Sequence, residues 1–381
     1  MKGAKINHDG DIRKPIINLL KAGLEQKIFD AVLIPMRIPS GESFAWILTQ
    51  DVDVLDEAYP LPPVISVQGA KALSSLTRLG EADMKIATLM RPCEIRAITE
   101  LNKLQQLSLD NISLFSIDCP GSLPNDEYMG DAEKGDEDFS SLLDNWNSDR
   151  IRDICQICDK FSITVSDIHI GLMAGENKDM FIIPNSLKGE KILEDLKMDT
   201  DQDLKNWSSL IEEISRDRKQ KREEKWKEVR KEYGRADNLL NFLSQCIACH
   251  TCRSVCPICY CRQCYFESDA FKLPSYNYLE RAQKKGSFRL PPDNLLFHLG
   301  RMQHMSMSCV SCGLCEDMCP MSIPISHLFS YVADKNQDVF DYVAGKDPDE
   351  PLPLTIYRTE ELEIIPEMYT ETHEERERKN A

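Results

Sequence analysis

The sequence predicts two parts of different construction: a mixed α/β (α+β or α/β) N-terminal half and a helical, cysteine-rich C-terminal half. Strand-like and helix-like segments alternate up to about residue 190, a highly charged stretch follows, and the composition then changes abruptly to one rich in cysteine. Alternating strands and helices are typical of a layered α/β domain, and the charged stretch is typical of a solvated connection between two domains. The boundaries predicted from these changes are 1–204, 205–238, 239–345 and a tail at 346–381.

Short segments rich in β-branched and aromatic residues predict the strands of the N-terminal half. Helices are expected over 69–82 and 93–109, where apolar residues recur at helical spacing. Because helices separate strands, we expect at least some parallel pairing. The predicted strands span 29–36, 44–51, 85–90, 112–119 and 179–184, with a further strand pattern inside 154–175.

Three segments are predicted to be peripheral. Residues 120–150 are acidic and rich in turn formers, which is typical of a surface excursion. Residues 205–235 carry charges of both signs, which predicts a solvated helix or linker, with a docking surface as the alternative. The tail from 346 is rich in Pro and Glu and is expected to be extended.

Composition narrows the functional classes. The formal charge of −17 disfavours nucleic-acid binding, because phosphate contacts need clustered Lys and Arg. The acidic surface suits docking with a basic partner or simply solubility. The first residues lack the apolar core of a secretory signal, and no window resembles a membrane helix, so we expect a cytoplasmic protein. In such a reducing compartment, 15 cysteines indicate metal ligation rather than disulfides.

Two cysteine runs share one spacing, Cys-x2-Cys-x2-Cys-x3-Cys-Pro. This is the bacterial ferredoxin spacing, in which three thiolates hold one 4Fe-4S cluster and the fourth reaches the other cluster. A zinc site needs four ligands in all and does not use this triple spacing. The predicted ligands of two 4Fe-4S clusters are Cys246, Cys249, Cys252, Cys256, Cys309, Cys312, Cys315 and Cys319.

The segment between the runs, which includes YNYLERAQKKG and DNLLFHLGRMQHM, has a helical pattern. The C-terminal half therefore resembles the α-helical ferredoxin domain of succinate dehydrogenase and heterodisulfide reductase iron–sulfur subunits. Three cysteines of the first run, Cys259, Cys261 and Cys264, exceed the motif. They could supply an alternative distal ligand, form a small site shared with a partner, or be structural.

Four further cysteines lie in the α/β half. Cys93 and Cys119 follow predicted strands, and Cys155 and Cys158 form a pair at chelating spacing. Since the carboxyl ends of parallel strands meet at one edge of a sheet, the four thiols could complete a third cubane. Buried structural thiols are the alternative.

The stretches RPCEIRAITELNKL, ISLFSIDCPG and CQICDKFSITVSDIHIG carry a resemblance to a known family. Over about residues 15–190 the chain resembles the beta subunits of coenzyme F420-reducing hydrogenase and F420-dependent formate dehydrogenase. The resemblance implies FAD beside a 4Fe-4S cluster on Cys93, Cys119, Cys155 and Cys158, with the flavin exchanging a hydride with the deazaflavin.

The flavin contacts that this resemblance implies are Asp167, Ile168 and Gly171, which match the turn of the family, with Gly175 after it. Arg91, beside Cys93, could bind the flavin phosphate or raise the cluster potential, or it could instead pair with Glu94. No GxGxxG is present, so a Rossmann-type site is not expected. Because 120–150 lacks the usual continuation of the family, NAD(P)H, ferredoxin or a partner's cofactor could replace coenzyme F420.

These observations predict an electron-transfer subunit of an oxidoreductase complex. It would pass electrons between a hydride carrier at FAD and a catalytic partner of the formate dehydrogenase, hydrogenase or heterodisulfide reductase type. The alternatives are a flavin-free iron–sulfur relay joining two enzymes and a redox sensor. No catalytic side chains of its own stand out, and nothing supports hydrolysis.

Overall fold

The computed structural model describes residues 2–173, 179–269, 274–286 and 294–356. Residues 1–348 form one compact unit and 349–381 form a second. Within the second unit, the described residues 349–356 contain no helix or strand. Most of the predicted tail, and Gly175, lie outside the described residues.

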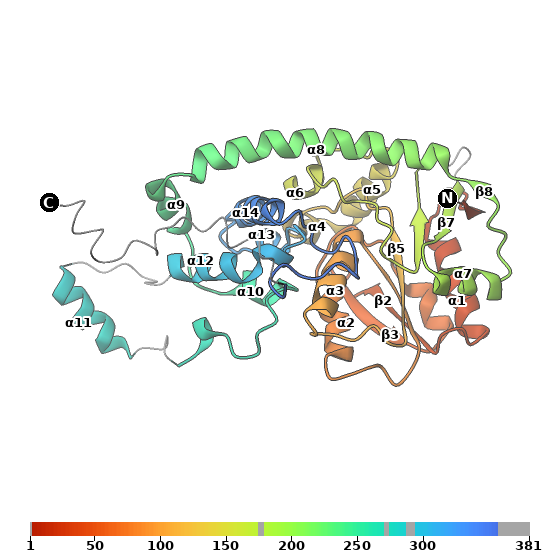
Figure 1. Cartoon of the computed structure of the whole chain (residues 1–381), viewed down its shortest axis with the longest axis horizontal. Helices are drawn as coiled ribbons and strands as arrows, with labels where there is room; N and C mark the ends of the chain where they lie inside the picture. Colours follow the sequence, from red (N-terminus) through yellow and green to blue (C-terminus); the bar gives the residue numbers. More distant parts are fainter. Residues whose placement is uncertain (1, 174–178, 270–273, 287–293, 357–381) are drawn as a thin grey trace, which may run out of the picture. The chain divides into compact units, whose positions relative to one another are not determined.

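A mixed eight-stranded sheet organises the N-terminal half, in the order β3-β2-β4-β5-β6-β7-β1-β8 (Figure 1). Strands β2, β4, β5 and β6 run parallel to one another, and the remaining neighbours are antiparallel. The expected mixed α/β layer is confirmed. The strands are β1 (Lys2–Asn7), β2 (Ala31–Arg37), β3 (Phe44–Thr49), β4 (Ile86–Met90), β5 (Ile112–Ile117), β6 (Ile168–Gly171), β7 (Asp179–Pro184) and β8 (Gln202–Asp203).

Strand β1 has no counterpart in the sequence prediction. It pairs with β7, where Ala4 lies opposite Ile182, and its buried residues Gly3 and Ala4 are small. Small residues give little strand signal, so the pairing depends on the tertiary fold rather than on local propensity.

Short helices connect and cover the strands. Residues 120–150, predicted as a surface excursion, contain two of them, and Tyr128, Phe139 and Leu142 are buried in the core. The helical elements are α1 (Arg13–Glu25), η1 (Asp53–Glu57), α2 (Gly69–Thr77), α3 (Pro92–Lys103), α4 (Asn125–Gly130), α5 (Ala132–Leu142), α6 (Asp153–Gln156) and α7 (Leu187–Asp195).

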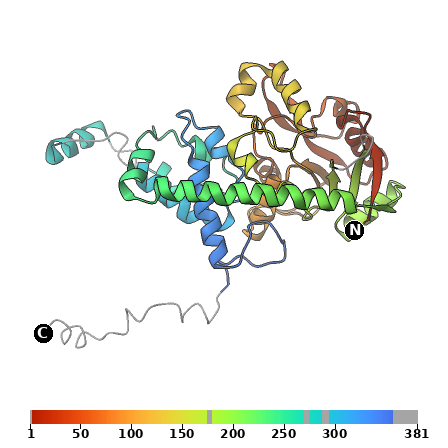
Figure 2. The ribbon, with the colours of Figure 1, turned by 90° about the horizontal axis from the view of Figure 1, so that it is seen from above.

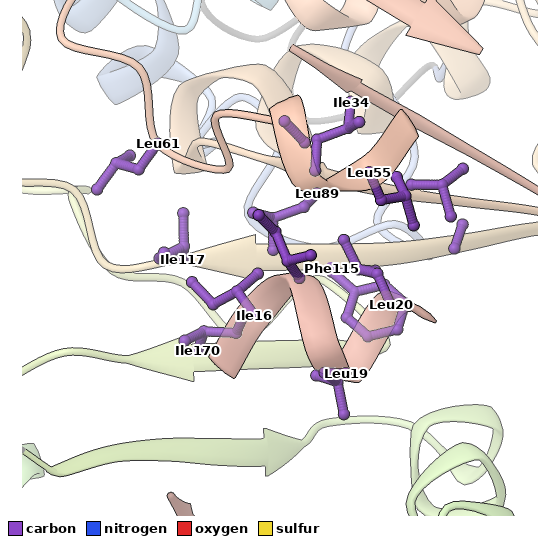
Figure 3. Packing of buried hydrophobic residues seen from close by; sticks show 14 of the residues in the cluster. Ile16, Leu19, Leu20, Ile34, Leu55, Leu61, Leu89, Phe115, Ile117 and Ile170 are labelled. Carbon is purple, nitrogen blue, oxygen red and sulfur yellow. The ribbon is translucent and has the colours of Figure 1, made fainter. Parts of the chain in front are cut away.

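The hydrophobic core lies between the sheet and its covering helices. Figure 3 shows Ile16 and Leu20 of α1 close to Leu89 and Phe115 of the parallel strands. Each of these side chains is at most 1% exposed. Full burial of such a side chain contributes about 1.5–3 kcal/mol, so this core holds the parallel strands, and the loops that follow them, in place.

The C-terminal half is helical in the described residues, as the pattern predicted. Short helices alternate with the cysteine loops, and α14 packs against several of them. The elements are α8 (Lys205–Tyr233), α9 (Ala236–Leu243), α10 (Thr251–Val255), η2 (Tyr265–Glu267), α11 (Ser275–Lys285), α12 (Asn294–Met305), η3 (Ser306–Ser308), α13 (Leu314–Asp317) and α14 (Ile325–Val339).

The charged stretch forms the long helix α8, which contacts both halves of the first unit (Figures 1 and 2). Near its start, the Trp207 indole donates a hydrogen bond to Asp118 at 2.8 Å. Near its end, the Trp226 indole donates to Asp334 of α14 at 2.6 Å. The helix is therefore not wholly solvated, because aromatic side chains at both ends are buried.

Helix α3 joins the two halves directly. The Arg96 guanidinium donates to the carbonyl oxygens of Ala344, at 2.9 Å, and Val310, at 3.2 Å. The Glu100 carboxylate accepts the Gly345 amide at 2.7 Å. The helix that carries Cys93 therefore also positions the loop that begins at Cys309.

Gly345 provides a test of this junction. Its φ is +69°, and a Cβ atom here would collide with the backbone of Arg96, so Gly345→Ala adds both strain and a backbone clash. Strain alone costs about 1–2 kcal/mol. We expect thermal unfolding, followed by circular dichroism, at a midpoint more than about 4 °C lower.

Gly41→Ala is the matched control for this substitution. Gly41 also has a positive φ, +86°, but no atom lies within 4 Å of the point that a Cβ would occupy. This variant should lose only the strain contribution. Equal shifts for the two variants would show that contact between α3 and the 345 loop does not stabilise the protein.

Candidate iron–sulfur sites

The four N-terminal cysteines line one cavity. Cys93 is the second residue of α3, shortly after β4, Cys119 follows β5, and the pair at 155 and 158 lies on and after α6. The cavity is lined by all four thiols. The structure therefore brings together, at the carboxyl edge of the parallel strands, the four cysteines that the sequence grouped.

Three buried arginines surround this cavity. Arg91 donates to the Cys119 sulfur at 2.8 Å, and Arg152 donates to the Cys155 sulfur at 3.4 Å. Arg218, 1% exposed, donates to the Pro120 carbonyl at 3.0 Å. The Nε atoms of Arg152 and Arg218 have no hydrogen-bond partner among the described residues. Buried cations with unused donors fit an anionic group, such as a thiolate-bound cluster, in this cavity.

The same cations act on the thiols. Burial raises the pKa of Cys155, but the Arg152 guanidinium and hydrogen bonds outweigh it, and the net pKa is lowered. At Cys93, burial and the negative charge of Glu94 raise the pKa. The thiols are therefore not equivalent: the pKa of Cys155 is lowered, whereas burial raises the pKa of Cys158, so Cys155 ionises more readily than Cys158.

A residue of the second cysteine run enters this N-terminal cavity. Cys312 and its neighbour Ser311 contribute to the lining, and Arg152 donates to the Cys312 carbonyl at 3.2 Å. Arg152 also pairs with Asp317 at 3.2 Å, with both side chains at most 6% exposed. The cavity of the α/β half thus adjoins the second run without an intervening element.

The first run shares a cavity with the last cysteine of the second. Cys246, Cys249 and Cys252 line one cavity together with Cys319. This is the crossed arrangement that the ferredoxin spacing predicts, in which the fourth thiol serves the other site.

Both cysteine loops have the same backbone turn. Residues on either side of the middle cysteine adopt positive φ: Ala248 and His250 around Cys249, and Ser311 and Gly313 around Cys312. In the first loop this turns the Ala248 amide toward the Cys246 sulfur, at 3.3 Å. Successive amides of this kind form an anion-binding concavity, which is typical of iron–sulfur sites.

The surplus cysteines separate into two kinds. Cys259 is half-buried, and a hydrogen bond to the Cys256 thiol, together with burial, raises its pKa. Cys261 is exposed and Cys264 is half-buried. Cys259 thus accompanies Cys256 as a candidate distal ligand, whereas the thiol of Cys261 is exposed.

The predicted flavin contacts do not gather at one place. Arg91 lines the thiol cavity, but the Asp167 carboxylate accepts the Leu114 amide at 2.9 Å and the Ser186 hydroxyl at 2.7 Å. Ile168 is fully buried in β6, and Gly171 packs beneath Trp207. In the described residues these three have structural partners away from Arg91.

A second cavity, which the sequence did not indicate, adjoins the thiol cavity. It shares Ile65 and Arg91 with the thiol cavity and is lined by Phe44 and Trp46 of β3 and three prolines. Its residues come from separate segments, so only the fold brings them together.

In the part of the chain that the structure describes, no three His, Cys, Asp or Glu side chains converge as ligands of one metal ion would. A zinc ion needs its ligands within about 2.3 Å of a single point. A cubane distributes its four thiolates over four irons, so separated thiols around a larger cavity suit it better.

Comparison with known proteins gives a family match in the C-terminal half and relatives over most of the chain. Residues 242–323 match a family model described as a 4Fe-4S dicluster domain. The beta subunit of F420-dependent formate dehydrogenase from Methanocaldococcus jannaschii is 30% identical over 312 residues, which cover 73% of this chain and 78% of that protein. The chain belongs to this family.

A second relative of this family, the beta subunit of F420-dependent formate dehydrogenase 1 from Methanococcus maripaludis, is 28% identical over 90% of this chain and 93% of that protein. A chain of the F420-reducing NiFe hydrogenase complex from Methanosarcina barkeri gives a TM-score of 0.46 at 10% identity, covering 61% of this chain and 92% of that one.

Family membership confirms the predicted resemblance and the predicted class, an electron-transfer subunit of an oxidoreductase complex. The family's C-terminal iron–sulfur part corresponds to the dicluster match. Across the described residues, no helix combines the length and apolar character that a membrane crossing requires.

Substitution of Cys319 tests the crossed arrangement. We expect Cys319→Ser to alter the same reduced-state EPR signal as Cys249→Ser, because both thiols line the cavity of the first run. Cys261→Ser, which removes an exposed thiol, should leave iron content and spectra unchanged. Loss of the signal that Cys312→Ser removes would contradict this placement.

Proposed function

We propose that the chain transfers electrons between a hydride carrier, which reacts at FAD in the α/β half, and a catalytic partner subunit, through three 4Fe-4S clusters. FAD supplies the conversion between hydride and single electrons, and the clusters supply one-electron carriers. The chain itself would hold these cofactors in position and would place charged side chains beside them. The proposed ligands are Cys93, Cys119, Cys155 and Cys158 for the first site, Cys246, Cys249, Cys252 and Cys319 for the second, and Cys309, Cys312, Cys315 and Cys256 for the third.

The observation that supports a continuous path is the position of Cys312. It belongs to the second run, yet it lines the cavity of the four N-terminal thiols. The Arg152 guanidinium donates to both Cys155 and the Cys312 carbonyl, which holds the two ligand sets next to each other. A short, fixed separation is what electron transfer between two carriers requires.

Buried cations support a charged cofactor in the N-terminal cavity. Arg91, Arg152 and Arg218 are each at most 7% exposed, and burial of three cations is costly unless anions compensate. Asp317 compensates one of them. A cluster bound by four thiolates would compensate the others, and its charge would favour the position that they surround.

For the flavin, we propose the cavity beside the thiols, where Arg91 lies between the two spaces. The Glu94 carboxylate, which lines this cavity, accepts the Gly69 amide at 2.7 Å and the Arg91 amide at 2.9 Å, and so fixes the wall between α2 and α3. Coenzyme F420 is the proposed hydride carrier, with NAD(P)H as the alternative.

The face around Cys249 is the proposed contact with the partner. Of the twelve proposed ligands, all of which are described, Cys249 is the exposed one. Ile247 is 51% exposed and Met321 is 42% exposed beside it, and neither 245–249 nor 320–323 contains a charged residue. An apolar, uncharged patch around an exposed ligand fits a stable contact with a formate dehydrogenase or hydrogenase subunit. We place the complex in the cytoplasm.

Cofactor content tests the proposal. Anaerobically purified protein should contain about twelve iron atoms and one FAD per chain, as three four-iron clusters and one flavin require. Iron is measured by chelation and FAD by fluorescence after release. About eight iron atoms and no flavin would instead support the flavin-free relay.

Trp46→Ala tests the flavin cavity separately from the clusters. Loss of this apolar wall should weaken FAD binding about tenfold, the effect of losing roughly 1.4 kcal/mol, while the iron content stays unchanged. Fluorescence titration of the flavin-depleted protein measures the affinity.

Ile47→Ala is the matched control for Trp46→Ala. Ile47 is the next residue of β3, and successive side chains point to opposite faces of a strand. It is 38% exposed, so its removal should leave FAD affinity unchanged. An unchanged affinity in Trp46→Ala would exclude this cavity as the flavin site.

A further inference from the structure

A buried arginine of α12 lies at the meeting point of the two cysteine runs. Arg301 is 3% exposed. Its guanidinium donates to the Cys252 sulfur at 2.9 Å and to the Cys252 carbonyl at 3.1 Å. Cys315 of the second run lies close enough to act electrostatically on the same charge.

The environment of Arg301 contains sulfur and aromatic carbon. Its guanidinium carbon lies 5.5 Å from the centre of the Phe297 ring and 4.9 Å from that of Phe329. The described residues include no carboxylate within ion-pair distance of it, and its Nε atom has no hydrogen-bond partner. An uncompensated buried cation is costly, so this position calls for negative charge close by.

Other arginines of the chain are compensated differently. The buried Arg152 pairs with Asp317, and the half-buried Arg222 pairs with Asp334 at 2.5 Å. Arg301 instead donates to the Cys252 sulfur and has no carboxylate partner among the described residues. The charge of Arg301 therefore remains available to whatever that thiol holds.

We propose that Arg301 sets the reduction potentials of both C-terminal clusters, an inference that rests on the two clusters of the proposed function. Reduction adds negative charge to a cluster, and a fixed cation in a low-dielectric interior stabilises the reduced form more than the oxidised form. The unused Nε–H is a donor available to a cluster sulfur, and hydrogen bonds to sulfur raise the potential in the same direction.

The contacts also indicate which of the two clusters Arg301 influences more strongly. Cys252 of the first run receives a direct hydrogen bond, whereas Cys315 of the second run is influenced through space. The potential of the first-run cluster should therefore depend more strongly on Arg301.

Arg301→Gln is the direct test. EPR-monitored redox titration of the purified protein should show the first-run cluster about tenfold harder to reduce, that is about 59 mV lower for one electron, with a smaller shift at the second run. Arg301→Lys retains the charge and should restore most of the potential. The N-terminal cluster should not shift, because Arg301 does not line its cavity.

Arg253→Gln is the matched control. Arg253 lies beside Cys252 in sequence, but it pairs with Glu267 at 2.6 Å and donates to the Cys261 carbonyl, so its loss should leave the potentials unchanged. Wild-type potentials in a fully iron-loaded Arg301→Gln variant would overturn the proposal.

A second variant tests the proposal if the Arg301→Gln protein does not bind iron. The Met305 sulfur lies 3.8 Å from the Arg301 guanidinium, so Met305→Glu places a carboxylate against an intact Arg301 and should lower the potentials likewise. Unchanged potentials there would also overturn the proposal. Eight iron atoms and no flavin in the wild type would refute the flavin function while leaving this inference on the two C-terminal clusters intact.

Discussion

The buried ion pair between Arg152 and Asp317 is the interaction on which the rest of the arrangement depends. Asp317 belongs to α13, directly after the second cysteine loop, and it also accepts the Asn125 amide at 3.1 Å. Arg152 belongs to the segment that carries Cys155. Removing one partner of a buried pair costs about 3–5 kcal/mol, because the other charge stays uncompensated. This pair therefore fixes the α/β cavity against the helical half.

The second cysteine run occupies the central place in the molecule. Through Cys312 it lines the N-terminal cavity, and through Cys315 it shares the charge of Arg301 with the first run. The three sites therefore have an order: the α/β cavity, then the second run, then the first run with its exposed Cys249. The order in space is thus the reverse of the order in sequence. The first run comes earlier in the chain but lies farther from the α/β cavity than the second run.

The sequence predicted what depends on local spacing. The parallel strands, the two helices between the runs and the grouping of the four N-terminal cysteines all follow from patterns of a few residues, and the structure has them. Two of the cations could not be predicted in this way, because Arg218 and Arg301 meet the cysteine segments only after folding. The turns of the two cysteine loops could not be predicted from glycine positions either, since three of their four residues with positive φ are not glycine.

The predicted flavin contacts show that a sequence match can also mislead. Asp167 and Ile168 match the family in sequence, yet in the structure they serve the start of β6. The cavity proposed for the flavin draws its walls from β3 and from loops without a shared motif, such as the segment that contributes Ile65. A ligand site assembled from separate segments has no signature in any one of them.

Helix α8 has a consequence for how the two halves can move. At 29 residues it extends about 43 Å, and it is anchored through Trp207 at one half and Trp226 at the other. Movement of either half away from the helix would break one of these hydrogen bonds. The helix therefore braces the thiol cavity of the α/β half against the cysteine loops of the helical half.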